Sequence, residues 1–92
     1  MIVRIMGEGQ LDVADDRLAA LSPLDDEVEA AVEADDEPAF RLALVVLLDR
    51  VREIGTPVPD DVLVPSELVL PAADANVEDV RDLFREGGLI PG

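Results

Sequence analysis

Apolar positions cluster at the start of the chain and take a helical spacing further on. In residues 2–5 the branched apolar residues Ile2, Val3 and Ile5 indicate a short β-strand. Gly7-Glu8-Gly9 is a turn signal, so residues 10–13 are expected to return beside the first strand as a hairpin. The apolar run at 68–70 is a candidate third strand beside residues 2–5.

Helical spacing begins at residues 15–16, two aspartates of the type that favours a helix start. Ser22 precedes Pro23, which suits the first turn of a helix and damages its interior. Asp25 lies at the capping-box distance from Ser22. These residues predict a break near Ser22 and a helix over 23–34. Its expected inward stripe is Leu24, Val28, Ala31 and Val32.

The next helical segment is the longest. Asp35 or Asp36 is expected to cap it, Pro38 lies in its first turn, and the helix is expected to run to Ile54 with Gly55 as its C-cap. One face is a continuous apolar stripe: Phe40, Ala43, Leu44, Leu47, Leu48, Val51 and Ile54.

This helix carries more apolar residues than one buried face requires. Leu42, Val45 and Val46 fall on the other side, near Asp49 and Glu53. A helix that is apolar on two faces is either buried on both or docks on another chain. The sequence leaves two interpretations open. The three residues pack beneath the chain's own hairpin, or they form a surface for self-association or for a partner.

The last third of the chain begins with a segment rich in proline. Its apolar residues predict an extended, rigid connector rather than a disordered linker. Asn76 is expected to cap a final helix from Val77 to about Glu86, with Asp79 at the capping-box position. Together these elements predict one α+β domain over residues 1–92. A short N-terminal β-hairpin, with the candidate third strand at 68–70, would pack against about three α-helices.

The composition removes most enzymatic chemistry. The chain has no His, Cys, Lys, Tyr or Trp, the side chains that supply most nucleophiles, neutral-pH bases and soft-metal ligands. We therefore expect no enzyme activity and no cofactor. The aspartate doublets at 15–16, 25–26 and 35–36 lack the loop frame of an EF-hand, and helix capping explains them better than a metal site does.

The charge restricts the partners. The chain has seven basic residues, all Arg, and 22 acidic residues, which gives a net charge of −15. Such a surface is unsuited to nucleic acid or to an anionic lipid layer. The start of the chain has no signal-peptide pattern, and the apolar run at 42–48 is far shorter than the roughly 18–20 residues of a membrane span. The expected location is cytoplasmic, without direct membrane insertion, and recruitment to the inner face of the membrane would require a partner.

Residues 52–71, which run from Arg-Glu-Ile-Gly-Thr-Pro to Ser-Glu-Leu-Val-Leu-Pro, resemble the PspA-associated protein family (PspAA). Residues 1–10 and 88–92 resemble it too, so the similarity covers essentially the whole chain. It departs from the family pattern at Leu11, Pro23 and Pro38. Members are encoded beside phage-shock protein A, a coiled-coil membrane-remodelling protein of the envelope stress response. The resemblance implies a partner or modulator of that protein and supplies no catalytic residues.

Two function hypotheses follow. The first is a non-enzymatic adaptor or regulator that binds a phage-shock A-like coiled-coil protein through Leu42, Val45 and Val46. Leu89 and Ile90 are a second candidate contact, and the acidic rim would steer the partner's basic positions. The alternative is a stand-alone homodimeric structural module that uses the same surface and has no heterologous partner.

An acidic excess without lysine fits a salt-adapted cytoplasm, and GC-rich codon usage alone is the competing explanation. Carboxylates that repel one another at low ionic strength are screened at molar salt, where the Debye length falls to about 3 Å. We expect the melting temperature to rise with KCl up to the molar range. Thermal melts that stay flat across that range would remove the salt-adaptation hypothesis.

Overall fold

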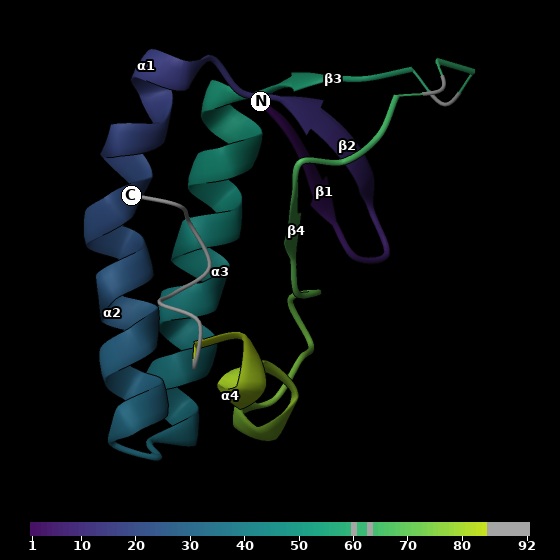
Figure 1. The fold of residues 1–92 in the computed structure, drawn as a ribbon. Helices are drawn as coiled ribbons and strands as arrows, with labels where there is room; N and C mark the ends of the chain where they lie inside the picture. Colours follow the sequence, from purple (N-terminus) through teal and green to yellow (C-terminus); the bar gives the residue numbers. More distant parts are fainter. Residues whose placement is uncertain (60, 63, 85–92) are drawn as a thin grey trace.

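The computed structural model describes residues 1–59, 61–62 and 64–84, and it has two layers, a sheet and a set of helices (Figure 1). The strands are β1 (Ile2–Ile5), β2 (Gly9–Asp12), β3 (Thr56–Pro57) and β4 (Leu68–Leu70), in the order β3-β2-β1-β4. The helices are α1 (Asp15–Leu18), α2 (Ser22–Glu33), α3 (Glu37–Ile54) and α4 (Val77–Phe84), with a 3₁₀ turn over Ala19–Leu21. The α+β prediction is confirmed.

The N-terminal hairpin forms as the sequence predicts. β1 and β2 are antiparallel, in a register that runs from Ile2 opposite Asp12 to Ile5 opposite Gly9. The amide of Glu8 donates to the carbonyl of Ile5 across the turn, at 2.9 Å. Gly7 and Gly9 have φ angles of 85° and 121°, which residues with a Cβ rarely adopt. The two glycines therefore fix where the chain reverses.

The sheet is wider than the hairpin because two distant segments join its edges. β4 pairs in parallel with β1, and this confirms the candidate strand at 68–70. β3 pairs antiparallel with β2, with Pro57 opposite Leu11 and Thr56 opposite Asp12. The sequence did not predict β3, because two residues that include a proline carry no strand pattern of their own. Their pairing depends on where α3 ends.

The predicted N-cap at Ser22 is wrong. Ser22 has helical angles, φ −57° and ψ −45°, and the residue before α2 is Leu21, which makes no side-chain cap. The chain passes from α1 through the 3₁₀ turn into α2 without leaving helical geometry. The first amides of α2 therefore continue a helical segment and need no side-chain cap. Pro23 is tolerated because it still falls in the first turn of α2.

The caps predicted for α3 and α4 are present, whereas α1 has no side-chain cap: its N-cap residue is Ala14, and Asp15 and Asp16 lie in its first turn. The Asp36 carboxylate accepts from the amide of Ala39 at 3.2 Å, at the start of α3. Asn76 and Asp79 form a reciprocal capping box at α4, with distances of 3.0 and 3.1 Å. The predicted end of that helix at Glu86 lies outside the described residues, and α4 is described to Phe84.

The core lies between the sheet and the helical layer. Alternate residues of the strands point into it, and α2 and α3 cover them with the stripes that their spacing predicts. Leu24, Ala43 and Ile54 are only partly buried at its margin. The fully buried side chains of the core include Val3, Ile5, Val13, Leu21, Val28, Phe40, Leu44, Leu47, Leu48, Val51, Leu70 and Val80. No helix within the described residues is long and apolar enough to cross a membrane.

Gly55 follows α3 as predicted, but for a different reason from the one expected. Its φ of −90° and ψ of 158° are extended and open to any residue. Space is the constraint, since an added Cβ would lie 2.9 Å from the carbonyl oxygen of Val51 and 3.1 Å from Cβ of Leu11. That carbonyl also accepts from the Gly55 amide at 2.8 Å, so it cannot move away without losing the bond. Gly55 thus allows α3 to end directly against β2.

We predict that Gly55→Ala lowers the free energy of unfolding by about 1–3 kcal/mol, because the methyl group overpacks the contact between α3 and β2. Urea unfolding followed by circular dichroism measures this change. Thr56→Ala, at the exposed neighbouring position, is the control and should have a much smaller effect. Equal stability of Gly55→Ala and the unsubstituted protein would contradict the close approach.

Candidate partner-binding surface

The outer face of α3 is apolar and exposed. Leu42 is 69% exposed, Val45 40% and Val46 42%, whereas residues on the opposite side of the helix are fully buried. The interpretation that these three residues pack beneath the chain's own hairpin is therefore wrong. The hairpin covers the inner face of α3, and the residues that carry the outer face remain open.

Leu42 and Val46 form one wall of an apolar groove between α2 and α3. Five alanines from the two helices and the turn between them also line the groove, which has a volume of about 480 Å³. Glu27 and Asp36 are the charged residues that line it. The alanines are Ala30, Ala31, Ala34, Ala39 and Ala43. Since alanine side chains end at Cβ, another element can approach these two helices closely.

The structure brings together two of the five predicted contact residues. Leu42 and Val46 line the groove, while Val45 is exposed on the same helix but does not line it. Leu89 and Ile90 lie outside the described residues. The sequence analysis missed the alanines, although they show an i,i+4 spacing: Ala30 on α2 with its C-cap residue Ala34, and Ala39 with Ala43 on α3. That spacing places each pair on one helix face.

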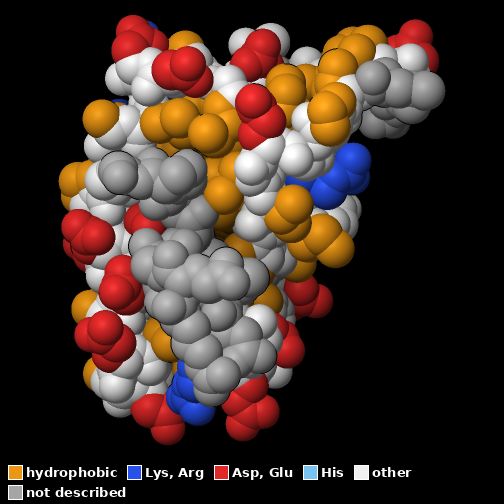
Figure 2. All heavy atoms as spheres, viewed as in Figure 1, with side chains coloured by type: hydrophobic (Ala, Val, Ile, Leu, Met, Phe, Trp, Pro, Cys, Tyr) orange, Lys and Arg blue, Asp and Glu red, His pale blue; other side chains and the backbone are white. Residues whose placement is uncertain are grey.

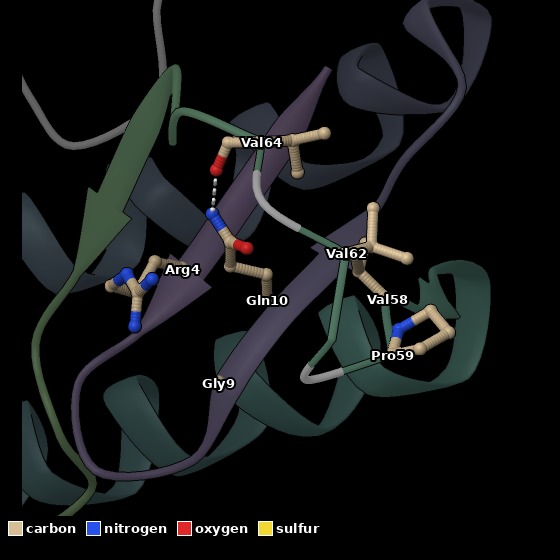
Figure 3. A pocket seen from close by; sticks show the side chains of 7 residues that line it. All are labelled: Arg4, Gly9, Gln10, Val58, Pro59, Val62 and Val64. Atoms are coloured by element: carbon tan, nitrogen blue, oxygen red, sulfur yellow. Dashed lines mark hydrogen bonds between the residues drawn. The ribbon is translucent and has the colours of Figure 1, made fainter.

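A second hollow lies on the other side of the sheet, and Figure 3 shows its lining residues. It has a volume of about 240 Å³ and is formed by β1, β2 and the segment that follows β3. Arg4 and Gln10 come from the strands, and Val58, Pro59 and Val62 come from that segment. The amide nitrogen of Gln10 donates to the carbonyl of Val64 at 2.9 Å, which ties the segment to the sheet.

Carboxylates dominate the charged surface. Figure 2 shows acidic side chains around the outline of the molecule and few basic ones on the same face. On α3, Arg41 pairs with Glu37 at 3.4 Å and Arg50 pairs with Glu53 at 3.0 Å. Within the described part of the chain, no group of three or more acidic side chains is arranged to hold a metal ion.

The sequence profile of the PspA-Associated protein family (PspAA) matches residues 1–92, the entire chain. The chain belongs to this family. Comparison with curated proteins and with solved structures found no match. The family's name concerns association with PspA, and the groove between α2 and α3 is the apolar surface that this member exposes on its helical side.

Arg52 connects the end of α3 to the hairpin turn. Its Nε donates to Glu8 Oε1 at 2.7 Å, and Nη2 donates to the other oxygen of the same carboxylate. Its Nη1 donates to Asp49 at 2.6 Å. The hydrogen bonds from Arg52, aided by its positive charge, hold the pKa of the Glu8 carboxyl below the ordinary value of 4.5. The same hydrogen bonds, which the Glu8 carboxylate accepts, raise the pKa of Arg52.

We predict that Glu8→Gln lowers the free energy of unfolding near pH 7 by less than about 1 kcal/mol, because solvent screens a pair whose side chains are 36% and 40% exposed. The folded pKa of Glu8 is depressed, so this contribution is fully present above pH 4.5 and disappears as the pH falls through the folded value. Denaturant unfolding of both proteins across this range measures the difference.

Glu53→Gln is a matched control, because Glu53 pairs with Arg50 inside the same helix and connects no distant segments. Its effect should be smaller than that of Glu8→Gln. A difference for Glu8→Gln that grows toward low pH would contradict the assignment, since its sign would be opposite to that of a depressed carboxyl.

Proposed function

We propose that this protein is a non-enzymatic adaptor that binds a phage-shock A-like coiled-coil protein in the envelope stress response. The groove between α2 and α3 would receive one helix of that partner. The observation that carries this proposal is the exposed apolar face of α3, with Leu42 and Val46, on a chain of the PspA-associated family. A cytoplasmic adaptor of this kind would reach the membrane through its partner.

The shape of the groove favours a helix as the occupant. Two packed helices leave a furrow along their line of contact, and side chains from a third helix fill such a furrow with ridges into grooves. The small alanines that line the groove permit a close approach, while Leu42 and Val46 supply exposed apolar area. A coiled-coil protein offers helices whose apolar residues repeat along one face.

Charge favours a partner with basic residues beside its apolar seam. Glu27 and Asp36 line the groove, and the whole chain carries a net charge of −15. Lys or Arg at the flanking positions of the partner helix would lie beside these carboxylates. Such complementarity accelerates association and rejects acidic helices, while the apolar groove supplies most of the affinity.

The test is co-purification with a phage-shock A-like coiled-coil protein in native salt. We predict that Leu42→Asp and Val46→Asp each weaken binding at least about tenfold, because each places a carboxylate in an apolar contact. Val69→Asp is the matched control. Val69 is also exposed, at 47%, but it lies on β4, away from the groove. Circular dichroism checks that the variants remain folded.

Light scattering on the isolated protein separates the two function hypotheses. We expect a monomer that forms a complex when the coiled-coil protein is added. A concentration-independent dimer that Leu42→Asp dissociates would instead support the homodimeric module. If both groove variants bind as well as Val69→Asp does, the groove is not the interface.

A further inference from the structure

The second hollow combines a cation and an apolar wall on one face of the sheet. Val3, Ile5 and Leu11 point toward the helices, so the alternating residues Arg4 and Gln10 point to the other face. Arg4 and Gln10 are directly opposite each other in the pairing of β1 with β2. In Figure 3, Gln10 lies between Arg4 on one side and Val58, Pro59 and Val62 on the other.

Among the described residues, Arg4 has no carboxylate partner, whereas most of the described arginines have one. Four arginines in the described part of the chain form ion pairs, namely Arg41, Arg50, Arg52 and Arg81. Arg4 and Arg17 form none with the described residues, and of these two Arg4 lines a hollow. A guanidinium that pairs with no described carboxylate, in a chain with 22 acidic residues, retains its capacity for an external anion.

Hydrogen bonds hold the two polar residues of the hollow in place. Ser66 Oγ accepts from Arg4 Nε at 3.2 Å and from Gln10 Nε2 at 2.7 Å. Gln10 Nε2 also donates to the carbonyl of Val64, so its orientation is fixed by two acceptors. Ser66 engages only the Nε edge of Arg4, and the two terminal nitrogens can donate to one carboxylate. This arrangement lowers the cost of ordering the side chain when a ligand binds.

We propose that this hollow binds a carboxylate carried on a short apolar body. Arg4 would take the carboxylate, and the body would lie across Gln10 against the wall of Val58, Pro59 and Val62. The volume of about 240 Å³ is below the roughly 300–1,000 Å³ of pockets for drug-sized ligands, so the ligand is about the size of one aliphatic residue. It is either a free aliphatic acid or the C-terminal residue of a polypeptide.

The experiment is a titration of ¹⁵N-labelled protein observed by NMR, with two carboxylate probes and their neutral amides. Isovalerate represents a free acid, and a peptide with a free C-terminal leucine represents a chain end. We expect the amide signals of Gly9, Gln10 and Val58 to shift with the carboxylates. The matched amides should bind at least about tenfold more weakly, because they lose a charge-assisted pair.

Arg4→Gln should weaken carboxylate binding by a similar factor, and Arg17→Gln is the control for the same change of charge at an exposed site elsewhere. Tighter binding of the peptide would identify a chain end as the source, and equal binding would show that the free acid suffices. The proposal is overturned if carboxylates and amides bind alike, if Arg4→Gln binds as Arg17→Gln does, or if no probe shifts these signals. None of these outcomes depends on the groove between α2 and α3.

Discussion

Helix α3 buries five side chains along one face, and these join the sheet to α2 in a single core: Phe40, Leu44, Leu47, Leu48 and Val51. Because consecutive residues of a helix are about 100° apart, fixing this face also fixes the rotation of the rest. Leu42 and Val46 must then lie on the outside, next to the alanines of α2. The same constraint directs the end of α3 toward β2, where Gly55 has no room for a side chain.

The excess of carboxylates affects which kind of partner the exposed groove would favour. Two copies of the chain would bring two charges of −15 together, and their repulsion opposes self-association at low ionic strength. A partner with basic flanks gains from the same field, because Glu27 and Asp36 already line the groove. Electrostatics therefore supports a heterologous occupant over a second copy, and the apolar area alone does not distinguish between them.

The sequence predicted those parts of the fold whose interacting residues are close together along the chain. The hairpin follows from Gly7-Glu8-Gly9, and the capping box of α4 follows from Asn76 and Asp79, because the interacting atoms are few residues apart. The prediction of a cap at Ser22 was wrong because the turn before it is also helical, with Leu21 packed in the core. Ser22 therefore lies inside a continuous helical segment and not at its start. The sequence did not predict β3, because these residues form a strand only by pairing with β2, which is far away in the sequence.

The candidate sites divide in the same way. The surplus of apolar residues on α3 is visible in the periodicity of the sequence, but the sequence left open whether that surplus is buried beneath the hairpin or exposed. The alanines of α2 complete the groove only because the two helices pack side by side, which no single period reveals. The hollow at Arg4 could not be predicted from the sequence, because Ser66 and Val64 bind Gln10 from more than fifty residues away along the chain.

The two surfaces lie on opposite sides of the molecule, and this placement bears on how an adaptor would work. The groove faces away from the core on the helical layer, while the hollow faces away from it on the sheet, with the buried side chains between them. No residue lines both. A helix bound in the groove would leave Arg4 accessible, so the two proposed sites would not compete, and one subunit could hold a coiled-coil partner and an anionic group at the same time.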